Sequence, residues 1–421
     1  VRDVNLSNTR SLDTWRMMGA AKNMEELEAA SASMGNPWTN TVAVDREGTA
    51  FYGDYSTTPN VTAAQINSCV RGLIAPALTQ AGYVTLDGSD PDCEWGNDED
   101  SQQEGTLGAS QLPSMTTSDY ALNSNDSYWL SNEDSPLTGY SPIVGEEQGE
   151  QTLRSRLAHI QIRDRLSGED GLGEGGFNNQ NMRDIMYGNR NYAAELITDS
   201  VIEVCSGDVD WSDYSTTPHR VIEACGILAG WDRKSNVDSI GPHLFLEMWK
   251  TLTSGDSFWA VPFDPNQPVV TPNTLDIENP NVVEHVKNSL ASAVERILEA
   301  GLEINQPWGE LQYVTRGDQD IPIHGSTGFG FSVIQSNLIP EEGYSDIFTG
   351  NSYIQVVSFD DTHCPDAQVA LTYSQSSNPA SPHYADSTEL YSEKQWIDVP
   401  YCSRDILSSK VGSVIRIRKG E

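Results

Sequence analysis

The spacing of apolar residues changes along this 421-residue chain, and this change limits its fold more than any other feature. Residues 9–32 repeat apolar groups at the spacing of one or two amphipathic helices. Residues 36–55 instead predict a β-hairpin, because Val42 and Val44 alternate with small or polar neighbours and the letters DREG that follow form a turn. The chain therefore combines helices and strands from its start.

Helical and strand-like patterns continue to the end of the chain. Residues 151–302 are mainly helical by pattern, including a stretch over 181–205 and an amphipathic helix over 281–302. The apolar face of this last helix consists of Val282, Val286, Leu290, Val294 and either Ile297 or Leu298. Strand-like segments follow, notably SYIQVVSF and AQVALTYSQ, and the chain ends in VGSVIRIRKG. Strands early and late with helices between them predict one α+β body over residues 1–421, not two independent domains.

The composition is that of a strongly acidic globular protein. A hydrophobic content of 37% is enough for a large core. Acidic residues outnumber basic ones 61 to 25, and the net charge of −36 argues against nucleic-acid partners and for a strongly solvated surface, adapted to a saline environment. General solubility is the alternative explanation of this charge. No apolar run approaches the ~20 residues of a membrane span.

The six cysteines indicate the compartment. They form three sequence-local pairs with no C-x-x-C spacing, which favours three disulfides in the periplasm or outside the cell. Buried free thiols are the alternative. The first residues, VRDVNLSNTR, do not form a signal peptide, so we expect an exported protein that was processed or truncated at its N-terminus.

The common active-site motifs are missing from the sequence. The acidic stretch 87–100 lacks the register of an EF-hand and is interpreted as a solvated loop. The glycine-rich stretch 324–332 lacks the context of a phosphate loop and is interpreted as a turn or a close backbone approach. The histidines show no metal-binding spacing, and no serine stands in a G-x-S-x-G motif. Spacing alone therefore indicates no complete active site.

One polar segment lies within the loop-rich region 86–152, which is long enough to line a site. This segment, YALNSNDSYWLSN (120–132), places asparagines and serines between aromatic residues. Its Asn125 heads an N-x-S sequon, but such triplets are frequent by chance. An Asx-turn in a polar loop is a second explanation of the asparagines.

Several segments together resemble the β-subunit of the penicillin acylase family of N-terminal-nucleophile hydrolases, especially its acyl-homoserine lactone acylase and aculeacin acylase branch. The matching segments are VRDVNLSNTRSLDTWRMMGAAKNMEEL, NPWTNTVAVDREGTAFYGDYSTTPNV, LNSNDSYWLSN, TLRSRLAHIQ, ACGILAGWDRKSNVDSIGPHLFLEMW, SYIQVVSF and TYSQSSNPASPHYADSTELYSEKQW. They run in family order over nearly the whole chain. The resemblance implies a four-layer αββα sandwich with peripheral helices.

The resemblance also implies a mechanism in which this chain carries only part of the machinery. In the family a precursor cuts itself, and a serine at the new N-terminus becomes the nucleophile, with its own α-amine as the base. Val1 is not a nucleophile, so we expect the serine upstream or on another chain. The expected partners are the α-subunit and the N-terminal part of the β-subunit from the same precursor. No cofactor is required, although some relatives bind structural calcium.

Two residues match the family's catalytic positions. Asn125 matches the asparagine whose side-chain amide donates to the oxyanion, a role that suits a neutral donor. Arg156 matches the arginine that braces this asparagine and the substrate, because its spacing to Ile160 selects it over Arg154. A solvent-exposed arginine on a helix face is the alternative.

Further residues follow from the same resemblance. Trp15 and Trp38 match positions that line the acyl pocket, although each alone would be interpreted as a core residue. The family pattern pairs Cys69 with Cys93 and Cys205 with Cys225, which leaves Cys364 and Cys402 as the third disulfide.

The sequence thus predicts an N-acyl amide hydrolase that works through an acyl-serine. Long-chain acyl-homoserine lactones are the first expected substrates, followed by lipopeptides and β-lactam side chains. One alternative is a family member without a working nucleophile, which would leave a binding scaffold. Another is an inactive, acidic exported surface protein or calcium-binding protein.

Overall fold

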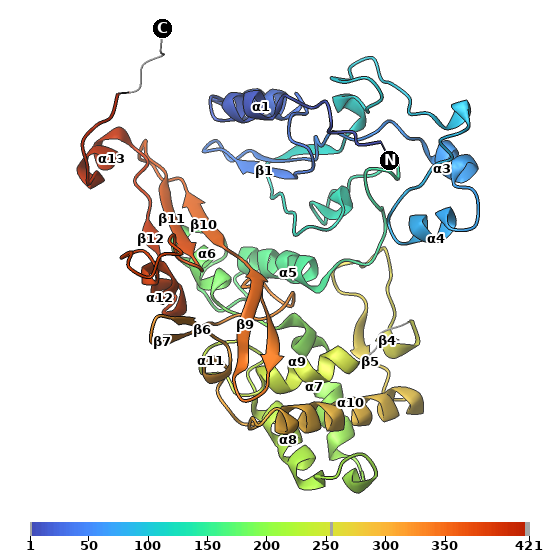
Figure 1. Cartoon of the computed structure of the whole chain (residues 1–421), viewed down its shortest axis with the longest axis vertical. Coiled ribbons are helices and arrows are strands. Elements are labelled where there is room, and N and C mark those ends of the chain that lie inside the picture. The colour runs from blue at the N-terminus through green and yellow to red at the C-terminus, as the bar shows by residue number, and fades with distance from the viewer. Residues whose placement is uncertain (1, 253–255, 417–421) are drawn as a thin grey trace. The chain divides into compact units, whose positions relative to one another are not determined.

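The computed structural model describes residues 2–252 and 256–416 of the chain (Figure 1). It contains two compact units, unit 1 (Val1–His159) and unit 2 (Ile160–Glu421). The single α+β body expected over residues 1–421 stays a prediction. The boundary falls inside helix α5 (Leu153–Ser167), so no linker marks it in the sequence.

Unit 1 combines short helices with one small sheet. Its α-helices before α5 are α1 (Ser11–Met18), α2 (Met24–Ser31), α3 (Ala63–Cys69) and α4 (Ala75–Gln80). Its 3₁₀ helices are η1 (Pro91–Cys93), η2 (Ala109–Gln111) and η3 (Tyr128–Leu130). Its strands are β1 (Thr41–Val44), β2 (Ala50–Gly53) and β3 (Ser114–Thr117), which form an antiparallel sheet in the order β1-β2-β3.

The predicted elements at the start of the chain are confirmed. Residues 9–32 form the two helices α1 and α2, and α2 begins after Asn23, whose side chain accepts a hydrogen bond from the Glu26 backbone N–H. Residues 36–55 form the β1–β2 hairpin. The apolar core beside it consists of Met24, Met34, Phe51, Tyr55, Leu107 and Leu112.

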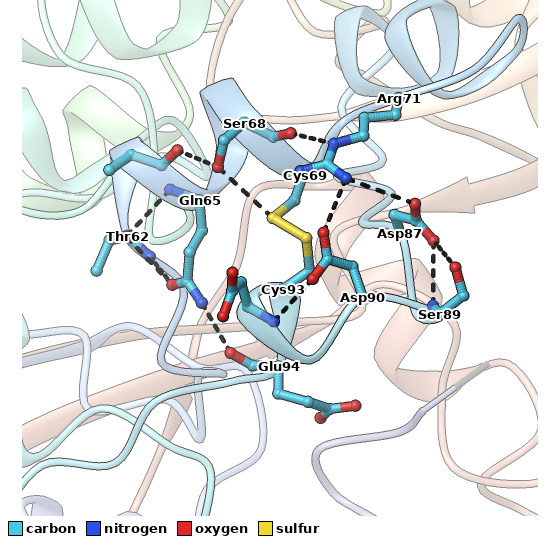
Figure 2. Close-up of a disulfide and its surroundings, with 12 residues drawn as sticks. Thr62, Gln65, Ser68, Cys69, Arg71, Asp87, Ser89, Asp90, Cys93 and Glu94 are labelled. Atoms are coloured by element: carbon cyan, nitrogen blue, oxygen red, sulfur yellow. Dashed lines mark hydrogen bonds and ion pairs between the residues drawn. A yellow bond between two sulfur atoms is a disulfide. The ribbon is translucent and has the colours of Figure 1, made fainter.

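The acidic stretch 87–100 is held in place on one side by a disulfide (Figure 2). Cys69, at the end of α3, is bonded to Cys93 in η1, and both are buried. The Arg71 guanidinium lies 2.8 Å from an Asp90 carboxylate oxygen and 3.9 Å from one of Asp87. The stretch is therefore anchored to the end of α3, while most of its residues are exposed, as its interpretation as a solvated loop requires. In the described part of the chain, no group of three or more His, Cys, Asp or Glu residues is placed to hold a metal ion.

Unit 2 contains the longer helices and most of the strands. Its α-helices after α5 are α6 (Asn179–Met186), α7 (Tyr192–Ser206), α8 (Pro218–Gly230), α9 (Pro242–Thr251), α10 (Pro280–Glu299), α11 (Trp308–Leu311), α12 (Asp386–Ser392) and α13 (Ser403–Ser409). Its 3₁₀ helices are η4 (Trp211–Asp213) and η5 (Asp256–Phe258). Its strands are β4 (Trp259–Val261), β5 (Asn273–Leu275), β6 (Tyr313–Arg316), β7 (Gln319–Pro322), β8 (Ile334–Ile339), β9 (Gly343–Gly350), β10 (Tyr353–Ser358), β11 (Asp366–Leu371) and β12 (Ile397–Asp398).

The sheets of unit 2 are small and antiparallel. Strands β10, β11 and β12 form one sheet, and β4–β5, β6–β7 and β8–β9 are separate pairs. The predicted segments SYIQVVSF and AQVALTYSQ correspond to β10 and β11. Residues 411–416 form no strand, and the rest of VGSVIRIRKG lies outside the described residues.

Helix α10 packs against α7, α8 and α9, which lie together in Figure 1. Its predicted apolar face is buried at Val282, Val286, Leu290, Val294 and Ile297, while Leu298 is only partly buried. A buried carboxylate joins this group of helices to β9, because Glu247 accepts hydrogen bonds from Lys250, Arg296 and Tyr344. Burial raises the pKa of Glu247, but the hydrogen bonds from Lys250 and Tyr344 outweigh it, so its pKa lies below the ordinary value.

The glycine-rich stretch 324–332 makes the close backbone approach that its sequence predicts. Gly325 has φ +94°, and a Cβ atom there would lie 2.4 Å from the Ser332 carbonyl oxygen. The neighbouring His324 is buried, and its ring stacks on Tyr391 with centroids 4.3 Å apart. Burial, followed by the charge of Lys394, lowers the pKa of His324 to about 3.

The three predicted disulfides are all confirmed. Cys205 of α7 is bonded to Cys225 of α8, and Cys364 is bonded to Cys402, which directly precedes α13. Among the described residues, no helix combines the length and apolar character needed to cross a membrane.

Candidate active site

The segment 120–132 is a loop of unit 1 whose two ends are tied together. The Leu122 backbone N–H donates to the Ser131 carbonyl at 2.8 Å, and Asn132 Nδ2 donates to the Tyr120 carbonyl at 2.9 Å. Between these ties, Tyr128 and Trp129 are buried in η3. The aromatic residues thus anchor the loop, and the polar residues 123–126 form its tip.

The tip has an Asx-turn, but Asn123 makes it and not Asn125. Asn123 Oδ1 accepts a hydrogen bond from the Asn125 backbone N–H at 2.9 Å, and its Nδ2 donates to the Asp126 carbonyl at 3.0 Å. Asn125 itself has φ +73°, in the left-handed region that asparagine tolerates better than most residues. The side chain of Asn125 is therefore not used in the turn.

An acidic residue joins the tip to the start of α5. Asp126 Oδ2 accepts hydrogen bonds from the Thr152 backbone N–H at 2.9 Å and from the Thr152 hydroxyl at 2.8 Å. Thr152 directly precedes α5, and its hydroxyl also accepts from the Ser155 backbone N–H at 3.4 Å. A carboxylate at a helix N-terminus is stabilised by the unpaired N–H groups there.

The side chain of Arg154, in the first turn of α5, sets the orientation of the Asn125 amide. Arg154 Nη2 donates to the Ser124 carbonyl at 2.6 Å and to Asn125 Oδ1 at 2.5 Å. An arginine can only donate, so the amide atom facing it must be the oxygen. The Nδ2 group consequently points away from Arg154. Asn125 is exposed, and no described residue accepts a hydrogen bond from its Nδ2.

The contact with Asn125 that the sequence predicts for Arg156 is made by Arg154. Residues two apart on a helix point in different directions, so both arginines cannot face the same loop tip. Arg156 is 0% exposed, whereas Arg154 is partly exposed. The spacing to Ile160 in the sequence does not show which of the two arginines faces the loop tip, because the rotation of α5 relative to the loop is set by the fold.

A second polar contact at the loop was not predicted. Tyr120 Oη lies 2.9 Å from His159 Nδ1 and accepts a hydrogen bond from the Glu133 backbone N–H at 3.0 Å. Burial raises the pKa of Tyr120 well above its ordinary value, so the hydroxyl stays protonated. The two residues are 39 positions apart, and no sequence pattern connects them.

The two predicted pocket tryptophans are both at the surface of the described chain. Trp15 on α1 is 58% exposed, and Trp38, just before β1, is 76% exposed. The interpretation as core residues is therefore excluded in this structure. Their role in an acyl pocket stays a prediction.

Comparison with known proteins identifies the family. The model of the penicillin amidase family matches residues 2–408. The chain belongs to the penicillin amidase family. It is 36% identical to aculeacin-A acylase of Actinoplanes utahensis over 99% of this chain and 52% of that protein. It is 33% identical to the acyl-homoserine lactone acylase PvdQ of Pseudomonas savastanoi pv. phaseolicola over 96% of this chain and 50% of that protein.

A solved structure confirms the fold. The thermostable penicillin G acylase of Alcaligenes faecalis aligns with 100% of this chain and 75% of its own, with a TM-score of 0.54 and 15% identity. This likeness confirms the predicted N-terminal-nucleophile hydrolase fold. The chain spans about half the length of the two curated relatives named above.

Proposed function

We propose that the complete protein hydrolyses N-acyl amides through an acyl-serine, and that the serine lies outside residues 1–421. The observation that carries this proposal is the hydrogen bond from Arg154 to the amide oxygen of the exposed Asn125, which directs the Nδ2 group away from Arg154. A neutral amide donor is not titrated near neutral pH, and it is most effective when it is held in place before the reaction.

The proposed reaction is an acyl transfer from the amide nitrogen to serine and then to water. The serine Oγ attacks the amide carbonyl carbon, and the α-amine of the same serine takes the hydroxyl proton. Asn125 Nδ2 donates a hydrogen bond to the resulting oxyanion. The tetrahedral species then collapses, the C–N bond breaks, and the leaving amine takes the proton from the α-ammonium. A water molecule next attacks the acyl-serine in the same way and releases the carboxylic acid.

The proposed substrates have a long acyl chain on an amide nitrogen. Acyl-homoserine lactones are the first proposed substrates, which the function of the relative PvdQ as an acyl-homoserine lactone acylase supports. Lipopeptides and β-lactam side chains are the next candidates. Trp15 and Trp38 would form part of the acyl pocket, because exposed aromatic side chains offer apolar area to a chain-like ligand. No cofactor enters the proposed steps.

The proposed partners are the remaining parts of the same precursor, namely an α-subunit and the N-terminal part of the β-subunit. Unit 1 exposes large apolar side chains of a kind that usually marks an interface. They are Leu12, Trp15, Trp38, Val42 and Val44. Strand β1, which carries Val42 and Val44, is also an outer strand of its sheet. An outer strand with apolar side chains suits pairing with another segment.

The proposed location is the periplasm or the exterior of the cell, and a saline environment fits the acidic surface. Three disulfides support an oxidising compartment. The net charge of −36 supports solubility at high salt.

The proposed function is tested by incubating the complete, processed protein with a panel of N-acyl-homoserine lactones, acylated peptides and penicillins. Release of the free amine and the free acid in equal amounts is the expected result. Release from none of these amides, by protein that is folded and cleaved, would leave a binding scaffold as the better description.

A further inference from the structure

We infer that Asp126 is a positioning residue that sets the direction of the Asn125 amide, an inference that rests on the proposed function. Asp126 follows Asn125 directly and takes no part in the contact with Arg154. It acts on Asn125 through the backbone, and not by touching a reacting atom.

The first argument comes from how the tip is attached. Residues 124–126 are held on α5 from two sides: Arg154 binds Ser124 and Asn125, and Thr152 binds Asp126. Both donors of Thr152 converge on one carboxylate oxygen, Asp126 Oδ2. A carboxylate accepts such hydrogen bonds more strongly than a neutral group does. The Asp126 clamp therefore fixes the backbone immediately after Asn125.

The second argument comes from the backbone of Asn125. Its φ of +73° is a left-handed conformation, which asparagine adopts more easily than most residues and which is one of several conformations open to it. The Asx-turn of Asn123 holds the N–H side of this residue, and the clamp at Asp126 holds the following peptide. If the clamp opens, the tip can relax, and the Nδ2 group changes direction.

The third argument concerns the charge of Asp126. Its carboxylate lies one residue from the amide that Arg154 must bind, and carboxylates form stronger pairs with arginine than amides do. The two hydrogen bonds from Thr152 hold Asp126 on the helix N-terminus. This arrangement leaves the Arg154 guanidinium on the Asn125 amide oxygen.

The test uses the complete, processed protein with variants Asp126→Asn and Asp126→Ala. Asparagine keeps an oxygen that can accept from Thr152, whereas alanine removes both hydrogen bonds. We expect kcat to fall by about tenfold in Asp126→Asn and by up to about a hundredfold in Asp126→Ala, with KM changed less than threefold, roughly as for a misplaced catalytic group. Asp134→Asn is the control, because it removes one charge near the loop without touching these contacts.

A double-mutant cycle separates positioning from simple stability. If Asp126 acts through Asn125, Asp126→Ala lowers kcat much less in the Asn125→Ala background than in the wild type. Equal losses in both backgrounds, or a lower melting temperature with an unchanged kcat per folded molecule, overturn the inference. An active wild type with a defective Asn125→Ala but a normal Asp126→Ala overturns the inference alone. A wild type inactive on every acyl amide overturns the proposed function as well.

Discussion

Replacing Asn125 with aspartate changes one atom of the proposed oxyanion donor. Aspartate has nearly the same size and shape, so an oxygen can still face Arg154, and the contact becomes an ion pair. Aspartate also tolerates the left-handed φ of +73°. The change is confined to Nδ2, where a donor N–H₂ group becomes a carboxylate oxygen that repels the developing oxyanion.

The magnitude follows from the loss of that single donor. Removing one oxyanion donor costs about 10² to 10³ in kcat, or about 2.7–4 kcal/mol of transition-state stabilisation. The stability of the fold should change by about 0.5 kcal/mol or less, because Asn125 is at the surface and its other contacts remain. Asn125→Ala is the less specific change, since alanine loses the Arg154 contact and strains a left-handed backbone by roughly 1–2 kcal/mol.

The assay measures release of the free amine by wild type and Asn125→Asp, with thermal unfolding of both. Each rate is divided by the amount of correctly cleaved protein, determined by mass spectrometry of the separated chains, because the precursor is expected to cut itself. A fall in kcat of at least a hundredfold with an unchanged melting temperature is the expected result. A kcat within threefold of wild type would refute the oxyanion role of Asn125.

Three further predictions concern other described residues. Arg154→Met should lower kcat by about tenfold or more with a small change in KM, because the amide of Asn125 loses its fixed orientation; a normal kcat would show that Arg154 does not orient it. Burial lowers the pKa of His324 to about 3 and that of His243 to about 4, so each imidazole stays neutral in the folded protein. In the unfolded chain each of these histidines binds a proton once the pH falls below its ordinary pKa. Stability is therefore lost as pH falls below about 6.5, by about 1.4 kcal/mol per pH unit for each histidine until the pKa of the folded state is reached. In urea unfolding at pH 6.5 and pH 4, His324→Gln should lose about 3 kcal/mol less than wild type, and an equal loss in both would contradict this assignment. The double variant Cys205→Ser/Cys225→Ser, which opens a loop of sequence separation 20, should be destabilised by about 3 kcal/mol, with an unchanged melting temperature as the contrary result.

The sequence predicts best those elements whose own residues carry a strong pattern. The helix α10 and the β1–β2 hairpin follow from apolar periodicity and from a turn, which are local properties. Strand β3, with the sequence SMTT, has no such pattern and is a strand because it pairs with β2. The helical stretch predicted over 181–205 is broken between α6 and α7. There Asn189 has φ +51°, and the backbone of Arg190 forms an isolated antiparallel β-bridge with that of Lys234.

The candidate site likewise contains contacts that depend on the fold and not on local sequence patterns. The resemblance to the family assigns Asn125 to the oxyanion position, because the matching segment LNSNDSYWLSN is short and continuous. It selects Arg156 where Arg154 makes the contact, because a shift of two residues along a helix changes the direction of the side chain but hardly changes the sequence match. The pair Tyr120 and His159 is formed by the fold alone.

The most direct measurement is to locate the acyl group on the enzyme. The complete, processed protein is mixed with an N-acyl substrate, quenched in acid within the first turnover, digested and analysed by mass spectrometry. We expect the acyl mass on a serine that precedes Val1 in the precursor, and less of it in Asn125→Asp. An acyl group on a residue within 1–421, or hydrolysis that forms no acyl-enzyme, would contradict the claim that this chain supplies the oxyanion donor to a nucleophile outside it.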